Sequence, residues 1–460
     1  MYLVDEHDAV PLTSVDDLIA HFRGAEKPSA DWRIGTEHEL IGVRAWSSAD
    51  GGPDAGTAPG YDGPDGIGTV LAGFAARGWV PVHEGGHVIA LTRGDDQITI
   101  EPGGQLELAA RPMLDGLELV TDLAAHTRAL AEISRPLGLA WLSIGFRPFG
   151  TRDLVPWMPK ERYDVMRAYM PKVGTRGLEM MQRTTTVQTN LDWSDEADAA
   201  AKLRCLLGVS SILTALYASS PIVDGKVSGY QSYRAHIWRD TDNARAGILK
   251  FAFERDDVYR AYVDWALDVP MYFVYRGGYR PVSGLTFRRF MAEGHDGAHA
   301  TRADWGLHLS TLFPDARMKR YLEVRGCDCG SMPMIAALGP LSRGLLYDAA
   351  ARDAAIALTS GLSFDERQRL ADLVPRSGLA TVVGQTTVGE LAKELVAIAA
   401  AGLARIEHGA ERSSLSLLDP VREIAETGRT QSDRIIEIWN QTGGEPGKAI
   451  PLLAHPGLHP

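Results

Sequence analysis

The sequence predicts an α+β protein, because strand-like and helix-like patterns dominate different parts of the chain. Runs rich in β-branched residues, such as Gln97-Ile98-Thr99-Ile100 and the alternating segment 183–192, recur through the first three quarters. Beyond about Ala337 the composition turns rich in Ala and Leu, with helical periodicity. We therefore expect a sheet-containing core over residues 1–340 and a helical region over 341–460 packed behind the sheet, as one continuous unit.

Composition and charge narrow the class of protein. The chain has 460 residues, 45% of them hydrophobic and 23% charged, which is ordinary for a globular protein with a sizeable core. A net charge of −12 argues against a general surface for nucleic acid or anionic membranes, so we expect neither as a partner. Three cysteines are too few for a disulfide framework, and neither a signal peptide nor an 18-residue apolar run is visible. These features predict a cytoplasmic protein.

Local patterns predict the elements in order. In the first half we expect helices over 13–23, 69–77, 114–137 and 195–218, strands over 34–43, 140–146 and 183–192, a hairpin over 79–92 and a loop over 47–66. In the second half we expect strands over 272–276 and 320–325, helices over 345–360, 364–373, 388–405 and 424–440, and a short tail after Pro446.

Two acidic stretches are the strongest chemical signal. Glu37 and Glu39 lie two residues apart on a predicted strand, so their side chains project to the same face. Glu101 and Glu107 flank a Pro-Gly-Gly interruption after the next β-branched run. Neighbouring carboxylates repel each other unless they face water or share a cation. From spacing alone, a magnesium-type oxygen cage and a pair of solvated strand edges are equally good interpretations.

A zinc-protease signature in the same region lacks its structural setting. The segment His83-Glu84-Gly85-Gly86-His87 matches H-E-x-x-H, which binds zinc only when both histidines lie one turn apart on a helix. Two glycines fall inside the motif and short strand-like runs flank it, so a hairpin is expected instead. We reject the metalloprotease interpretation.

Basic and polar groups recur further along the chain. Between 158 and 172 four basic side chains lie among aromatic residues and methionines, which is typical either of a solvated helix face or of an anion-binding segment. Segment 230–243 is dense in aromatic and hydrogen-bonding groups, which suits recognition of a small polar ligand. Polar side chains share one face of two predicted strands: Gln188, Asn190 and Asp192 on the first, and Tyr321, Glu323 and Arg325 on the second.

Taken together, these stretches resemble the plant and proteobacterial type of glutamate–cysteine ligase, from about Trp32 to about Asn440. Several long motifs occur in the family's order, which is far more specific than any one alone. The matching segments are Ile34-Gly35-Thr36-Glu37-His38-Glu39, Glu101-Pro102-Gly103-Gly104-Gln105 with Glu107, Met158-Pro159-Lys160 with Arg162-Tyr163, Tyr169 to Gly174, Val187-Gln188 with Asn190-Leu191-Asp192, His236-Ile237-Trp238 with Asp240-Thr241-Asp242-Asn243, Asp268 to Arg276, and Lys319 to Glu323 with Arg325-Gly326.

The resemblance implies a glutamine-synthetase-like fold, in which an antiparallel sheet curves into a funnel surrounded by helices. Residues 1–340 would form the catalytic core. The implied reaction is ATP-dependent: the γ-carboxylate of glutamate is phosphorylated, and the acyl phosphate is attacked by the amine of cysteine, as in the first step of glutathione-type thiol biosynthesis. The implied cofactors are ATP and Mg²⁺, the partners are small-molecule substrates, and the protein would be a monomer or homodimer.

The resemblance also implies roles for individual residues. Metal ligands would be Glu37, Glu39, Glu101, Glu107, Gln188 and Glu323. Arg325 and Asn190 would bind the nucleotide, with Arg325 on phosphate. Arg234 and Arg325 would be the catalytic residues. Substrate would be held by Arg234, Trp238, Tyr233, Arg167 and Lys172.

The chain departs from the family pattern after Arg325-Gly326. Where the family usually shows Ala-Asp-Gly-Gly-Pro-Trp-Arg-Arg, this chain has the small and apolar segment Cys327 to Met334. In the hairpin over 88–100, a Lys that is usual in the family is replaced by Thr92. A γ-glutamyl ligase with a different amine acceptor is therefore an alternative. A second alternative is a non-catalytic nucleotide-binding homologue, which loss of a metal carboxylate would favour; none is lost.

Overall fold

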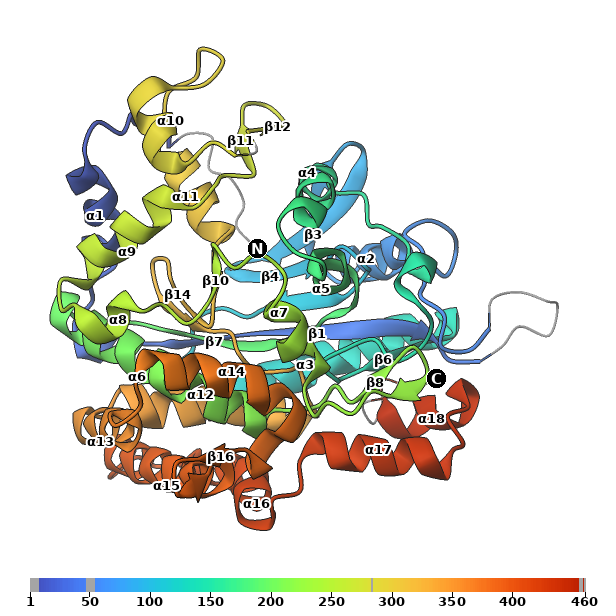
Figure 1. Ribbon diagram of the computed structural model, residues 1–460. Coiled ribbons are helices and arrows are strands. Elements are labelled where there is room, and N and C mark those ends of the chain that lie inside the picture. The colour runs from blue at the N-terminus through green and yellow to red at the C-terminus, as the bar shows by residue number, and fades with distance from the viewer. Residues whose placement is uncertain (1–7, 47–53, 283, 455–457, 459–460) are drawn as a thin grey trace.

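The computed structural model describes the chain except for residues 1–7, 47–53, 283, 455–457 and 459–460. In the part that it describes, an antiparallel sheet of nine strands runs across the middle of the molecule (Figure 1). Along the sheet the order is β14 (Ala316–Met318), β15 (Leu322–Val324), β7 (Val187–Leu191), β1 (Ile34–Arg44), β5 (Leu106–Ala109), β4 (Asp96–Ile100), β3 (His87–Arg93) and β2 (Val80–Glu84), while β6 (Leu139–Leu142) pairs with the far end of β1.

Strand β1 is the centre of this sheet. Its 11 residues pair with β7 on one side and with β5 and then β6 on the other, and nearly every side chain is buried. A strand covered on both faces is expected to carry few exposed polar groups, so the carboxylates of Glu37 and Glu39 stand out. The expected α+β class with an antiparallel sheet is confirmed.

A layer of helices covers one face of the sheet, below it in Figure 1. Helix α12 (Met332–Leu346) packs directly on β1 and β7, and α15 (Val388–Ile406) packs behind α12. The two helices approach closely at glycines: a Cβ on Gly344 would lie 2.2 Å from the carbonyl oxygen of Ala399. Further members of the layer are α3 (Gly116–Ser134), α6 (Glu196–Leu216), α13 (Ala349–Thr359), α14 (Phe364–Ser377) and α16 (Asp419–Thr427).

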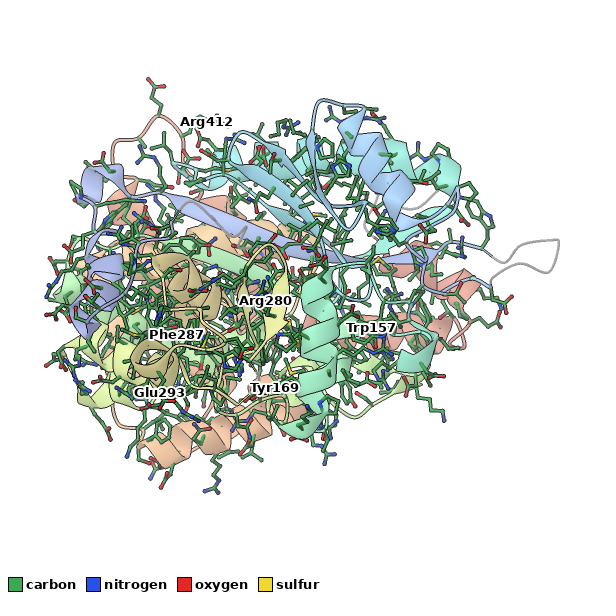
Figure 2. All side chains as sticks on the ribbon, turned by 90° about the horizontal axis from the view of Figure 1, so that it is seen from above. Trp157, Tyr169, Arg280, Phe287, Glu293 and Arg412 are labelled. Atoms are coloured by element: carbon green, nitrogen blue, oxygen red, sulfur yellow. The ribbon has the colours of Figure 1, made fainter. Side chains whose placement is uncertain are left out.

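Shorter elements surround the opposite face, above the sheet in Figure 1. They are α4 (Glu161–Tyr169), α5 (Gly177–Arg183), α7 (Tyr233–Trp238), α9 (Val258–Asp268), α10 (Phe287–Glu293), α11 (Arg302–Ser310) and the hairpin of β11 (Phe273–Tyr275) and β12 (Tyr279–Pro281). Figure 2, which looks down on this side, shows α4 beside the hairpin that carries Arg280.

The remaining elements are short or peripheral. They are α1 (Val15–Arg23), α2 (Ile67–Ala75), β8 (Ile222–Val223), β9 (Lys226–Val227), β10 (Ala246–Gly247), α8 (Phe251–Glu254), β13 (Phe313–Pro314), β16 (Val382–Val383), β17 (Thr386–Thr387), α17 (Gln431–Gln441), α18 (Pro446–Leu453), and 3-10 turns at Ser29–Asp31, Arg135–Leu137, Arg152–Leu154, Met170–Lys172, Gly378–Ala380 and Leu415–Leu418.

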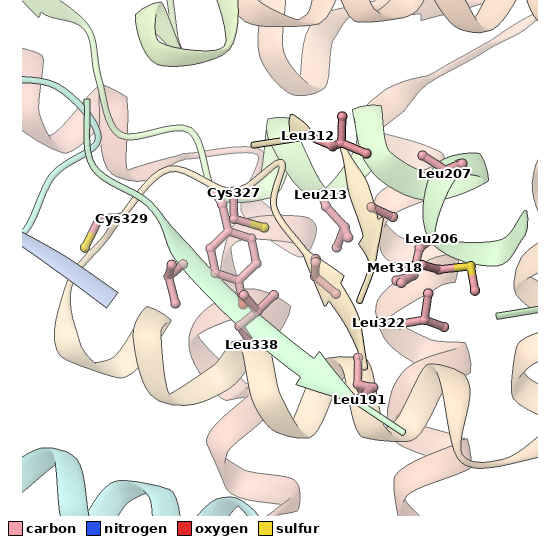
Figure 3. Close-up of a cluster of buried hydrophobic side chains, with 14 of the residues drawn as sticks. Leu191, Leu206, Leu207, Leu213, Leu312, Met318, Leu322, Cys327, Cys329 and Leu338 are labelled. Atoms are coloured by element: carbon pink, nitrogen blue, oxygen red, sulfur yellow. The ribbon is translucent and has the colours of Figure 1, made fainter. Parts of the chain in front are cut away.

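One large apolar core joins the sheet to the helical layer. Figure 3 shows part of it, where Leu191 of β7, Leu213 of α6 and Leu338 of α12 come together with Cys327. Helix α6 is the one helix among the described residues that is long and apolar enough to cross a membrane, but 83% of its most apolar window is buried inside the structure. This burial is typical of a core helix.

Several expected elements differ in their bounds. The strand expected over 183–192 begins only at Val187, because Gly177–Arg183 forms α5. The helix expected over 424–440 is two helices, since Gly428 ends α16 with a φ of 71°. The tail expected after Pro446 is helix α18, which the proline begins at its first turn. The loop expected over 47–66 lies partly outside the described residues.

Candidate active site

A polar cavity of about 150 Å³ lies on the face of the sheet that the short helices surround. Strands of the central sheet supply its acidic and amide groups, and α4, α5, α7 and α11 supply the rest of the wall. The acidic and amide side chains are Glu37, Glu39, Glu101, Gln105, Glu107 and Gln188; the basic ones are Arg162, Arg234, Arg317, Lys319 and Arg325.

Strand register brings the carboxylates together. Glu39 of β1 lies directly opposite Glu107 of β5, and Glu37 lies opposite Gln188 of β7. Glu101 follows the last residue of β4, two strands away from β1. Alternation along β1 therefore places both of its glutamates on the cavity face, as expected, while His38 between them is buried against the ring of His126.

Burial and mutual repulsion disfavour the ionised forms of Glu39 and Glu101. Burial raises the pKa of Glu39 well above its ordinary value, and the charges of Glu101 and Glu107 add to the effect. Burial, followed by the charge of Glu107, raises the pKa of Glu101 to about 7. Such a group of carboxylates is stabilised in its ionised form by a cation with oxygen ligands. As the side chains lie, no three acidic, histidine or cysteine groups among the described residues converge on one point as a finished metal site.

Basic side chains cover Glu323 at the edge of the acidic group. Its carboxylate is fully buried and contacts Arg317 Nη2 at 2.7 Å, Lys319 Nζ at 3.0 Å and Arg325 Nη1 at 2.5 Å. Burial alone would raise the pKa of Glu323, but the three cations outweigh it and hold the pKa well below its ordinary value. Arg317, Lys319 and Arg325 line the cavity, whereas Glu323 lies behind them and anchors them.

One hydrogen bond connects this basic group to β7, and a second connects β7 to Glu37 of β1. Arg325 Nη1 donates to Gln188 Oε1 at 2.7 Å, and Asn190 Nδ2 donates to Glu37 Oε1 at 2.8 Å. A guanidinium beside an acidic cavity is suited to hold an anionic oxygen of a phosphate against a metal-binding group. Asn190 thus contacts a cavity carboxylate, but it is not itself part of the cavity wall.

Arg234 and Trp238 of α7 form another part of the cavity wall, and the charge of Arg234 acts on Glu39. Arg234 Nη2 donates to the backbone oxygen of Arg325 at 3.0 Å, and the Trp238 ring packs on Phe313 with centroids 5.5 Å apart. A second, smaller chamber of about 50 Å³ adjoins the cavity and shares these four residues.

Three expected substrate residues lie outside the cavity wall. Arg167 is exposed on α4 with its guanidinium over the ring of Trp157, and Lys172 is exposed in the turn that follows. Tyr233 packs against Phe146, with ring centroids 5.1 Å apart, and does not line the cavity. The basic side chains between residues 158 and 172 therefore do not share one face. Of the arginines on α4, Arg162 lines the cavity and Arg167 does not.

The sequence interpretation missed several residues of the cavity. Arg317 belongs to a strand of only three residues, too short for an alternation pattern to reveal its face. Tyr163 also lines the cavity. Its hydroxyl and the amine of Lys160, which is outside the cavity wall, both donate to the carbonyl oxygen of Ile100 at 2.7 Å and so fix the end of β4 beside Glu101. The spacing Lys160-x-Arg162-Tyr163 at the start of α4 was the available signal for Tyr163.

The H-E-x-x-H segment lies in the β2–β3 hairpin, where Glu84 pairs with His87 and His83 pairs with Val88. The two histidines are therefore on different strands of a turn, which confirms the rejection of a helical zinc site.

Comparison with known proteins gives a consistent result. A family described as glutamate-cysteine ligase family 2 (GCS2) matches residues 33–450. The chloroplastic glutamate–cysteine ligase of Nicotiana tabacum is 40% identical over 442 residues, covering 95% of this chain and 81% of that protein. The enzyme of Arabidopsis thaliana is also 40% identical, over 445 residues, 96% of this chain and 82% of the relative.

Solved structures show the same fold at low identity. The glutamate–cysteine ligase of Francisella tularensis in complex with AMP superposes with a TM-score of 0.54 at 13% identity, covering 92% of this chain and 87% of that one. A bifunctional glutathione synthetase from Pasteurella multocida gives a TM-score of 0.50 at 13% identity, with 92% and 52% covered.

The expected cytoplasmic location is wrong by this comparison. The curated relatives at about 40% identity are named chloroplastic, so the comparison contradicts the expectation of a cytoplasmic protein. The expectation rested on features such as the low cysteine count, which do not distinguish cytoplasm from plastid.

Proposed function

The chain belongs to glutamate-cysteine ligase family 2, and from this premise we propose that it joins glutamate and cysteine through a γ-glutamyl amide bond with ATP as the energy source. The observation that carries the proposal is the cavity itself, in which four carboxylates face a cluster of cations across one small space. A site for phosphoryl transfer between two anionic substrates needs both groups.

The proposed reaction has two steps. The γ-carboxylate oxygen of glutamate attacks the γ-phosphorus of ATP, ADP leaves, and a γ-glutamyl phosphate forms. The amine of cysteine then attacks the acyl carbon, phosphate leaves with the electron pair of the acyl–oxygen bond, and the amine releases a proton. Arg325, with Arg317 and Lys319 beside it, would neutralise charge on the transferred phosphoryl group. Arg234 would hold the amino-acid end of glutamate, with Trp238 as an adjoining wall.

Mg²⁺ fits the chemistry of the donor set. Glu37, Glu39, Glu101 and Glu107 offer only oxygen ligands. Burial first and mutual repulsion second raise the pKa values of Glu39 and Glu101, and a bound cation would favour their ionised forms. These four residues would hold Mg²⁺, which supplies charge neutralisation between the phosphates of ATP and the attacking carboxylate. Gln188 and Glu323 are engaged by Arg325 and are weaker candidates for ligands.

Cysteine remains our proposed acceptor despite the altered segment after Gly326. Residues 327–343 contribute no side chain to the cavity wall, since Cys327 and Cys329 are buried and the segment continues into α12 on the other face of the sheet. The departures from the family pattern therefore lie behind the reacting groups. We also propose that the substrates are small molecules and that the protein works as a monomer or homodimer. Its catalytic core would lie in residues 1–340.

The test is turnover with defined substrates. Purified protein with ATP, Mg²⁺, glutamate and cysteine should release ADP and form γ-glutamylcysteine, detected by mass spectrometry, and EDTA should stop the reaction until Mg²⁺ is restored. Parallel reactions with other amines test the alternative acceptor. Absence of ADP release with every amine would refute the ligase and favour a non-catalytic homologue. Glu101→Gln should abolish turnover in a folded protein, and a rate equal to that of the unsubstituted enzyme would contradict the metal assignment.

A further inference from the structure

We propose that Asp328 is a positioning residue, which holds Arg234 in the orientation that grips the substrate. The proposal rests on the proposed function, since Arg234 is the residue that we assign to the amino-acid end of glutamate. Asp328 lies in the Cys-Asp-Cys segment, which supplies no side chain to the cavity wall, and it is 1% exposed.

The Asp328 carboxylate accepts hydrogen bonds from three serines that are themselves buried. Its Oδ2 accepts from the backbone N–H of Ser219 at 3.0 Å and from the hydroxyl of Ser220 at 2.6 Å. Its Oδ1 accepts from the hydroxyl of Ser232 at 2.8 Å. Arg234 Nη1 approaches the same Oδ1 at 3.9 Å. A buried carboxylate with this many donors is fixed in place, because losing any one contact leaves a buried polar atom unsatisfied.

The same serines control the start of α7, the helix that carries Arg234. Ser232 caps α7 by accepting from the backbone N–H of Ala235 at 3.1 Å, and Ser220 Oγ accepts from the backbone N–H of Arg234 at 3.1 Å. Asp328 therefore acts on Arg234 in two ways: its charge faces the guanidinium, and its serine contacts fix the backbone of the residue.

The other side of Asp328 is closed by Gly145. A Cβ on Gly145 would lie 2.5 Å from Asp328 Cγ and 2.7 Å from its Oδ2, so any larger residue there would displace the carboxylate. Gly145 does not line the cavity, and the three atoms nearest to such a Cβ all belong to Asp328. Substitution at 145 thus offers a way to move Asp328 without changing any residue that we assign to the substrate.

Burial raises the pKa of Asp328, while Arg234 and the three serines act in the opposite direction. The donor set favours the ionised carboxylate, because two hydroxyls and one N–H donate to its oxygens.

The experiment compares three single variants of the full-length protein. Asp328→Asn should raise the KM for glutamate about tenfold or more, since one charged partner of the network is lost, while the KM for ATP stays within about twofold. Gly145→Ala should change the two KM values in the same pattern. The matched control is Asp304→Asn, because Asp304 is equally buried and accepts from Thr301 and, at 2.8 Å on both oxygens, from Arg276. It should lower the melting temperature and leave the KM for glutamate unchanged.

Two results would overturn the proposal. One is a folded Asp328→Asn enzyme with an unaltered KM for glutamate; the other is an equal rise in both KM values in all three variants, which would indicate general destabilisation. If the unsubstituted protein forms no γ-glutamyl product, the proposed function fails, and crystal structures decide the positioning role separately. Asp328→Asn should then lose the contact between Arg234 Nη2 and the carbonyl oxygen of Arg325, and its retention would refute the inference.

Discussion

Replacing Glu323 by Gln tests whether one buried carboxylate organises the basic side of the cavity. The substitution keeps the shape of the side chain and removes the charge that faces Arg317, Lys319 and Arg325 at 2.5–3.0 Å. Breaking a buried ion pair on one side costs roughly 3–5 kcal/mol, because the partner charges stay buried without compensation. We therefore expect Glu323→Gln to lower the free energy of unfolding by about 4 kcal/mol.

Urea unfolding followed by tryptophan fluorescence measures this loss. With an m-value of about 3 kcal/mol per molar urea, the midpoint should fall by about 1.3 M. The control is Glu423→Gln, which removes an exposed partner of Arg434 and should shift stability by less than about 1 kcal/mol. ADP release should also fall sharply in Glu323→Gln, since the cations that face the phosphoryl group lose their anchor.

The pH dependence gives an independent check. The pKa of Glu323 is depressed in the folded protein, so its stabilisation is complete above the pKa of the unfolded carboxyl and is lost as pH falls through the folded value. The difference in stability between the unsubstituted protein and Glu323→Gln should therefore be largest near neutral pH and shrink on acidification below about pH 4. A Glu323→Gln protein as stable as its parent at pH 7, with unchanged turnover, would refute the reasoning.

Three further predictions concern residues away from the acidic group. Burial lowers the pKa of His308 to about 3, so between that pH and the ordinary pKa of histidine the unfolded state binds more protons than the folded state. The free energy of unfolding should therefore fall by about 2 kcal/mol from pH 7 to pH 5. His308→Gln should flatten this pH dependence, measured by urea unfolding at each pH. Arg167→Ala should leave the KM for glutamate and ATP within about twofold, because its guanidinium stacks on Trp157 outside the cavity; a tenfold change would restore it as a substrate residue. His83→Ala should retain full ligase activity with Mg²⁺, and loss of activity with loss of bound zinc would contradict the hairpin assignment.

Local periodicity predicted the parts of the fold that depend on it. Strand β1 and its two glutamates were predictable, because alternation of buried and functional side chains is an intrinsic property of a strand. The pairing of Glu39 with Glu107 was not, since register depends on contacts between segments far apart in the sequence. The same limit applies to the basic group, where a three-residue strand and a turn bring Arg317 and Lys319 onto Glu323.

Errors arose where a local pattern has two tertiary outcomes. Arg162 and Arg167 lie on one short helix, and periodicity could not tell which of them faces the cavity. The prediction of one helix over 424–440 overlooked Gly428, where a left-handed glycine ends one helix and Thr430 caps the next. The division into a core over 1–340 and a helical region over 341–460 stays a prediction, and the apolar core includes residues from both parts.

The geometry of β1 has a consequence for how this protein can change during evolution. Because Glu37 and Glu39 face the cavity while His38 and Leu40 face the helical layer, a single inserted or deleted residue within the strand would exchange the two sets. Carboxylates would then enter the apolar core and an imidazole would enter the cavity. Single substitutions at the cavity wall adjust one group at a time, so new specificities are accessible through point changes there, whereas length variation is confined to the connections outside the strand.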